Sequence, residues 1–167
     1  MKRLNALLRP TLMTLALGLT AMSAFAATPA GFVDDASAKG LAEIQTSELA
    51  LQKSQSADVK KFAQMMVDDH TAANKELAQV ATGLKLKVAD DAELMARAKK
   101  MVLEYRDESF DKAYANNQVV AHEQTIELFE EEIKSSKTPE LTAFAKKTLP
   151  KLQHHLEEAK SLQAKYK

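Results

Sequence analysis

The sequence predicts an all-α protein, a bundle of four long helices with one long connection between the second helix and the third. Apolar residues recur at intervals of three and four along almost the whole chain after residue 30, which is typical of helices with one buried face. The 167 residues include only four Gly and four Pro, too few for the many turns of an all-β fold. No stretch alternates between apolar and polar residues for long enough to be a strand.

The first 26 residues have the three parts of a secretory signal peptide. Basic residues without any acid precede an apolar stretch over residues 12–25, and Ala24-Phe25-Ala26 places small residues where a signal peptidase cuts. We therefore predict export, cleavage after Ala26 and a mature domain of residues 27–167. An uncleaved membrane anchor is the alternative, although fewer than ~18 apolar residues lie between the basic region and the cleavage motif.

The charge balance and the absence of cysteine exclude several functions. The whole chain has 23 basic and 23 acidic residues, but Lys2, Arg3 and Arg9 lie in the signal peptide, so the mature domain has 20 basic against 23 acidic residues. Such a domain lacks the basic surface that nucleic acids and anionic membranes require. The absence of cysteine excludes disulfides and thiolate metal sites. We expect a periplasmic protein with no nucleic-acid partner and no membrane insertion after cleavage.

Residues 30–54 and 57–83 are the first two predicted helices. Ser56 precedes the second helix as an N-cap, and Gly83 stands at its end. The apolar stripe of the first helix contains Val33, Ala36, Ile44 and Leu51, and that of the second contains Val59, Phe62, Ala63, Met66, Ala73, Leu77, Val80 and Leu84.

The last predicted helix begins at Thr138-Pro139 and ends near residue 165. Thr138 is expected to be its N-cap, and Pro139 takes the first helical position, where its missing N–H has no partner to lose. Pro150 falls inside this helix, removes one backbone hydrogen bond and is expected to kink it.

Residues 107–135 form the third long helix, and residues 91–105 form a shorter amphipathic helix before it. The two apolar stripes are offset, so we expect a break near Asp107. Four long helices with one long connection between the second and the third describe a ferritin-like bundle. A simple up-and-down bundle, with residues 91–135 as one bent helix, remains the alternative.

Polar side chains on the apolar stripes mark a candidate site. His70, His122 and His155 each lie within about 60° of a core-facing residue on their own helices. Glu43 is the acid of the first helix that lies nearest its inward face. His154 falls on the opposite face of the last helix and is expected to be exposed to solvent.

These four inward residues stand at one height in the bundle. Glu43, His70, His122 and His155 each lie within roughly three residues of the middle of their helix, or ~4.5 Å along its axis. Three imidazoles and a carboxylate in one layer suit a first-row transition-metal ion such as zinc, copper, iron or manganese. A layer of hydrogen-bonded side chains that fixes helix register, with no metal, is the alternative.

Further polar residues surround this layer. The side chains expected to orient the imidazole rings are Asp69, Gln118 and Glu123. Asp111 lies ~16 Å from His122 along the helix axis, so with Tyr114 it is expected to close a hydrogen bond near one end of the bundle. The run Glu130-Glu131-Glu132 is typical of a solvated face rather than a cation site.

Six segments in order along the chain resemble the domain-of-unknown-function 4142 family, whose members are exported bacterial proteins grouped with the ferritin-like superfamily. The segments are Phe32-Val33, Gly40-Leu41-Ala42-Glu43, Phe62 to His70, Phe110-Asp111-Lys112-Ala113-Tyr114, His122-Glu123 and Leu149 to Leu156. The resemblance covers about residues 31–163 and supports a crossover over residues 85–106. It implies no reaction. It also implies that the family's signature positions are His70, Asp111, Tyr114, His122 and His155.

One departure limits the chemistry expected of the site. Iron-oxidising ferritins carry Glu-x-x-His on two helices, whereas Val67 and Val119 stand three residues before His70 and His122 here. A carboxylate-rich di-iron centre is therefore not expected, and a mononuclear histidine site remains.

Three functions fit the sequence. The first is a periplasmic bundle that binds or stores a transition-metal ion. The second is a non-enzymatic structural or stress-related bundle whose polar layer is architectural. The third is an oxidoreductase that uses the bound metal. Motifs of serine nucleophiles, phosphate loops and dinucleotide sites are absent, which favours the first two functions.

The signal-peptide prediction has a direct test. Intact-mass measurement on exported protein should give a chain that begins at Ala27, because Ala24-Phe25-Ala26 directs cleavage. An exported chain that retains residues 1–26 would contradict this interpretation.

Overall fold

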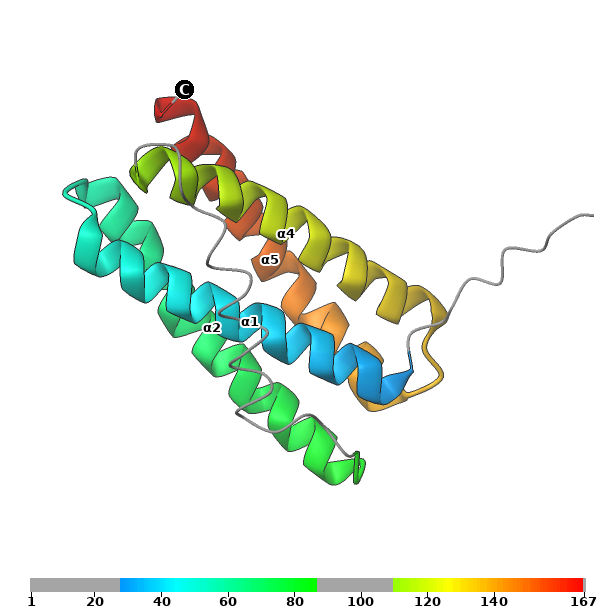
Figure 1. Cartoon of the computed structure of the whole chain (residues 1–167). Coiled ribbons are helices and arrows are strands. Elements are labelled where there is room, and N and C mark those ends of the chain that lie inside the picture. Colours follow the sequence, from blue (N-terminus) through cyan, green and yellow to red (C-terminus); the bar gives the residue numbers. More distant parts are fainter. Residues whose placement is uncertain (1–27, 87–109, 167) are drawn as a thin grey trace, which may run out of the picture.

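The computed structural model of the chain describes residues 28–86 and 110–166. These residues form four α-helices: α1 (Pro29–Lys53), α2 (Ala57–Gly83), α4 (Phe110–Ser135) and α5 (Pro139–Lys165) (Figure 1). The four-helix bundle predicted from the sequence is confirmed. Within these two ranges no helix is long and apolar enough to cross a membrane. The predicted signal peptide, the helix over 91–105 and the break near Asp107 lie outside the described residues.

Local sequence signals mark the starts of α2 and α5. Ser56 Oγ accepts a hydrogen bond from the backbone N–H of Val59 at 3.4 Å, as expected of an N-cap. Thr138 is the N-cap residue of α5 and Pro139 takes the first helical position, as predicted, although the Thr138 side chain forms no capping hydrogen bond. The Thr138 N–H donates to Ser136 Oγ at 3.1 Å.

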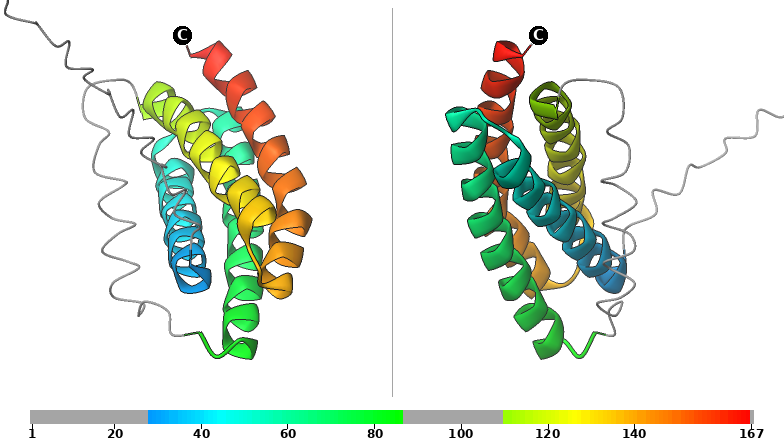
Figure 2. Two further views of the ribbon diagram at one scale, coloured as in Figure 1. Left: turned by 90° about the vertical axis from the view of Figure 1, so that its right-hand side faces the viewer. Right: turned by 60° about the vertical axis from the view of Figure 1, so that its left-hand side comes forward.

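Helices that pack together run antiparallel. Short turns join α1 to α2 and α4 to α5, while α1 also packs against α4 and α2 against α5. Phe32 stacks edge-on against Phe129, whereas Ser47, later in α1, pairs with Tyr114, earlier in α4. It follows that α2 and α4 are parallel (Figures 1 and 2). A parallel second and third long helix is the arrangement of a ferritin-like bundle and not of the up-and-down alternative, in which they would be antiparallel.

Two apolar clusters fill the bundle, and a polar layer separates them. One cluster contains Phe32, Val33, Ala36, Leu77, Ala81, Phe129, Leu141, Phe144, Ala145 and Leu152. The other contains Ala50, Val59, Phe62, Ala63, Met66, Tyr114, Ala115, Val119, Ala159 and Leu162. The buried polar side chains between them include Glu43, His70, Gln118, His122 and His155. Because burial of apolar surface drives folding on both sides, the polar layer is held in place by the packing of its neighbours.

Gly40 permits a close contact between α1 and α2 inside this frame. Asn74 Nδ2 donates to the backbone oxygen of Ser37 at 3.1 Å, which ties the two helices together. A Cβ atom at position 40 would lie 2.2 Å from Asn74 Oδ1, so the amide would have to leave its place. The absence of a side chain at Gly40 therefore protects this inter-helix hydrogen bond.

We expect Gly40→Ala to destabilise the protein by about 1–2 kcal/mol, although alanine favours a helix by ~1 kcal/mol over glycine. In an Asn74→Ala background the same substitution should stabilise the protein by about 1 kcal/mol, because the steric conflict is gone. Urea unfolding of the four proteins of this cycle measures both effects. A stabilising Gly40→Ala in the wild-type background would contradict the contact.

Candidate metal centre

Three helices bring His70, His122 and His155 together in the middle of the bundle. His70 lies on α2, His122 on α4 and His155 on α5, and the ring centroids are 5.4–5.7 Å apart. Each ring offers one nitrogen, and these three atoms lie within 4.8 Å of one another. The side chains are 6%, 1% and 1% exposed, respectively. The neighbouring His154 is exposed, as its place on the opposite face of the helix predicts.

A backbone carbonyl orients the ring of His122. His122 Nδ1 lies 2.8 Å from the carbonyl oxygen of Gln118, one turn earlier in α4. Because a carbonyl oxygen can only accept, the proton is on Nδ1 and Nε2 presents its lone pair. His122 Nε2 is buried and has no hydrogen-bond partner.

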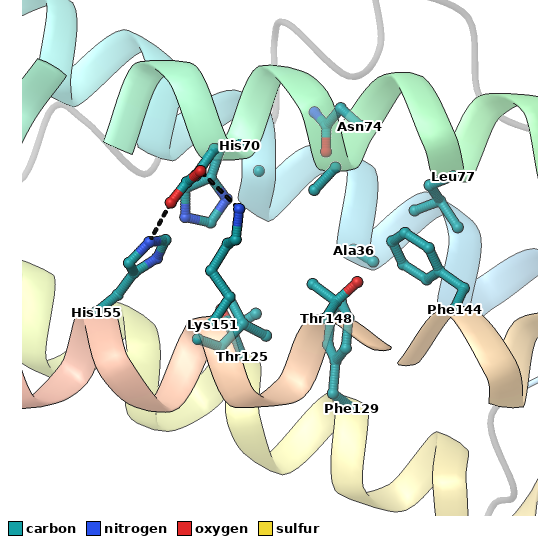
Figure 3. A pocket seen from close by; sticks show the side chains of 14 residues that line it. Ala36, His70, Asn74, Leu77, Thr125, Phe129, Phe144, Thr148, Lys151 and His155 are labelled. Carbon is teal, nitrogen blue, oxygen red and sulfur yellow. Dashed lines mark hydrogen bonds and ion pairs between the residues drawn. The ribbon is translucent and has the colours of Figure 1, made fainter. Parts of the chain in front are cut away.

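A carboxylate orients the ring of His155 in the same way but through the other nitrogen. His155 Nε2 lies 2.9 Å from Asp69 Oδ2, and Asp69 Oδ1 accepts from Lys151 at 2.7 Å (Figure 3). Partial burial alone would raise the pKa of Asp69, but the bonds from Lys151 and His155 outweigh it and hold that pKa below its usual range. The ionised carboxylate accepts the Nε2 proton, so His155 Nδ1 presents its lone pair. That nitrogen is also buried and without a partner.

Burial keeps two of the rings neutral. Burial, together with the nearby imidazoles, lowers the pKa of His155 to about 4 against the opposing effect of Asp69. Burial, with the neighbouring His122 and His155, also holds the pKa of His70 well below 6.5. His70 Nε2 is the third buried nitrogen without a partner. Neutral imidazoles with free lone pairs are the form in which histidine binds a metal ion.

Glu43 lies beside this cluster and not within it. Its carboxylate does not belong to the group of ligand atoms that lie within 4.8 Å of one another in the described part of the chain. Glu43 is 4% exposed, and burial raises its pKa despite the opposing effects of the nearby His122 and of a hydrogen-bonding contact with the Gln118 side chain. Glu43 Oε2 and both amide atoms of Gln118 are buried, and none of them is in hydrogen-bonding geometry with a partner.

The other residues singled out from the sequence lie at different distances from the three imidazoles. Asp69 contacts His155 directly, while Gln118 contacts His122 through its backbone carbonyl. Glu123 faces away and forms a half-exposed ion pair with Lys160 at 3.2 Å.

Two further residues lie toward the ends of the bundle. Tyr114 pairs through its hydroxyl with Ser47 Oγ at 2.9 Å, and Asp111 is half-buried in the first turn of α4.

Sequence reasoning missed one buried acid. The prediction that Glu130-Glu131-Glu132 is a solvated face is wrong for Glu132, which is 1% exposed. Burial raises its pKa, and a hydrogen bond with Ser136 opposes that shift. The signal was present, because Glu132 stands one turn after the buried Phe129 on the same stripe of α4.

The chain belongs to the family described as domain of unknown function 4142, which matches residues 15–162. Two solved structures share its fold, and both are forms of CopM. The Cu(II)-bound form aligns with a TM-score of 0.65 and 16% identity, covering 83% of this chain and 97% of that one. The Ag-bound form, obtained by soaking, aligns with a TM-score of 0.66 and 17% identity, covering 83% and 96%. No curated protein sequence matches this chain.

The buried neutral histidines make the metal-free protein sensitive to acid. His70 and His155 have a lower pKa in the folded state than the 6.5 of the unfolded chain, so the unfolded chain binds more protons below that pH. Their contribution to stability is complete above about pH 6.5 and is lost as the pH falls toward 4. Each histidine lowers the free energy of unfolding by up to about 1.4 kcal/mol per pH unit in this window.

Urea unfolding in the presence of a chelator, between pH 7 and 4.5, measures this effect. His155→Gln should reduce the slope by about one histidine's share, whereas His154→Gln should leave it unchanged because His154 is exposed. An identical slope in wild type and His155→Gln would contradict the expected protonation.

Proposed function

We propose that this protein binds a single late transition-metal ion through His70 Nε2, His122 Nε2 and His155 Nδ1. The observation that carries the proposal is that the three rings bring ligand nitrogens within 4.8 Å of one another, while each ring also has a buried nitrogen without a hydrogen-bond partner. Leaving a buried polar atom unpaired costs about 1–3 kcal/mol, so three such atoms at one point need a compensating ligand. A metal ion supplies that compensation at all three atoms at once.

Copper is the first candidate for the ion, and zinc the second. Imidazole nitrogen suits both metals, and copper binds most tightly of the divalent first-row ions. The three facing atoms include no carboxylate oxygen, which disfavours manganese and magnesium. The CopM structures of the same fold hold Cu(II) and Ag, and this supports copper as the first ion to test.

The architectural alternative accounts for less of the geometry. A polar layer that only fixes helix register would satisfy its own hydrogen bonds. Here His122 and His155 each hydrogen-bond to an oxygen acceptor through one ring nitrogen. The other nitrogen of each ring is buried and has no hydrogen-bond partner. We further propose that the mature domain acts in the periplasm, which rests on the signal-peptide pattern of residues 1–26. Binding and storage, or delivery, of the ion are the roles that fit a site without a catalytic motif.

We expect copper to raise the melting temperature of the untagged, chelator-treated protein, since it binds the native state and not the unfolded chain. At one hundred times the dissociation constant the stabilisation is about 2.7 kcal/mol. Alanine at His70, His122 or His155 should each weaken copper binding at least tenfold by calorimetry, with strongly non-additive double variants.

His154→Ala is the matched control, because it removes the same side chain one position away on an exposed face. Its copper affinity should equal that of the wild type. An unchanged melting temperature with copper, together with destabilisation by His70→Ala or His122→Ala, would establish the architectural role instead. Elemental analysis of untagged protein from the periplasm then identifies the ion that the cell supplies.

A further inference from the structure

An ion bound by three imidazoles has room for a fourth ligand, and the polar layer has two sides from which one can come. One side lies between α2 and α5, and the other between α1 and α4. The hydrogen-bonding state of the residues on each side decides between them.

On the side of α2 and α5, the buried polar side chains already have partners. A cavity of about 20 Å³ lies there beside His70 and His155, which is room for about one water molecule (Figure 3). Three of its polar neighbours are engaged: Asp69 with Lys151 and His155, Asn74 with the Ser37 carbonyl, and Thr125 with the Ala121 carbonyl. Thr148, which is half-buried, also lines the cavity, and α1 and α4 contribute to it as well. The remaining lining is largely apolar, with Ala36, Ala73, Leu77, Phe129, Phe144 and Leu152.

The side between α1 and α4 has three buried polar atoms that no well-formed hydrogen bond satisfies, although Glu43 and Gln118 lie close enough to interact with each other. They are Glu43 Oε2, Gln118 Oε1 and Gln118 Nε2. Gln118 is fully buried, one turn before His122, and Glu43 is close enough to His122 to interact with it electrostatically. Gln118 Nε2 can donate to a water molecule or to an anion, while Glu43 Oε2 and Gln118 Oε1 can accept from a water molecule.

We infer that the ion keeps a fourth coordination position on the side of Glu43 and Gln118, which a water molecule or a small anion that replaces it occupies. This inference rests on the proposed metal binding at the three histidines. It assigns to Glu43 and Gln118 the recognition of the guest through hydrogen bonds, and not direct bonds to the ion. It also defines the centre as open to exogenous ligands, in contrast to a closed structural site.

The experiment uses the full mature protein loaded with Cu(II) and titrated with azide, a small anion that replaces water on copper. Calorimetry first measures copper affinity in every variant, and the azide-to-copper charge-transfer band then measures azide affinity. We expect a saturable band in the wild type. Gln118→Leu should weaken azide binding about tenfold or more while copper affinity stays within about threefold, because only the hydrogen bonds to the guest are lost.

Two further variants make the test specific. Thr125→Val is the matched control on the same helix, since it removes a hydroxyl that already has a partner on the cavity side. It should leave azide affinity unchanged. Glu43→Gln should keep copper affinity within about threefold, whereas a carboxylate bound directly to the ion would make this variant lose tenfold or more.

The possible failures are distinguishable. If the wild type binds no copper, the proposed function fails and this inference fails with it. If copper binds but azide produces no band, or if Gln118→Leu equals the wild type, the open position near Gln118 is wrong and the metal site stands. Loss of azide binding in Thr125→Val alone would place the guest in the cavity between α2 and α5 and overturn the inference. Circular dichroism confirms that each variant retains its helices before it is titrated.

Discussion

The rest of the structure depends on one constraint: three imidazoles are buried at a single point, and each has a buried nitrogen without a hydrogen-bond partner. Removing such groups from water is unfavourable unless each finds a partner, so the surrounding chain has to hold them there. The packing of the two apolar clusters on either side of the layer keeps the imidazoles in place. Packing of the helices therefore positions the site, and the site in turn requires helices that are already packed.

The hydrogen bonds around the imidazoles determine which ring nitrogen of His122 and of His155 is left without a partner. Asp69 and the Gln118 carbonyl accept from opposite kinds of nitrogen, Nε2 of His155 and Nδ1 of His122. Had the acceptors been on the other nitrogens, the lone pairs would point away from the shared centre. Asp69 is itself fixed by an ion pair with the half-exposed Lys151. This surface ion pair therefore helps to determine the tautomer of the buried His155. An ion pair of small value for stability can thus matter for binding.

Helical periodicity was sufficient to predict the fold and the three histidines, because both follow from which face of a helix is apolar. The same rule separated His155 from His154. It also placed Glu132 on an inward stripe, and the prediction failed there only because a run of three acids was treated as one unit. Other features lay beyond the sequence. Whether Glu43 joins the three imidazoles depends on side-chain rotamers and on the spacing between α1 and α4. Whether the Thr138 hydroxyl forms a capping bond depends on its side-chain rotamer.

The topology gives the site a further property that no single helix has. His70 and His122 come from α2 and α4, which lie diagonally across the bundle, while His155 comes from α5, which packs against both. An ion at this point would link two helices that pack mainly against other partners. Residues 70, 122 and 155 are far apart in the sequence, so only the folded chain brings them together. Metal binding at this point would therefore be coupled to the formation of the tertiary structure. α1 is the helix that contributes no imidazole, and it brings Glu43 to the remaining side of the layer. In the proposed site, three helices would supply the imidazoles that bind the ion, and the fourth would bring Glu43 to the remaining side of the layer.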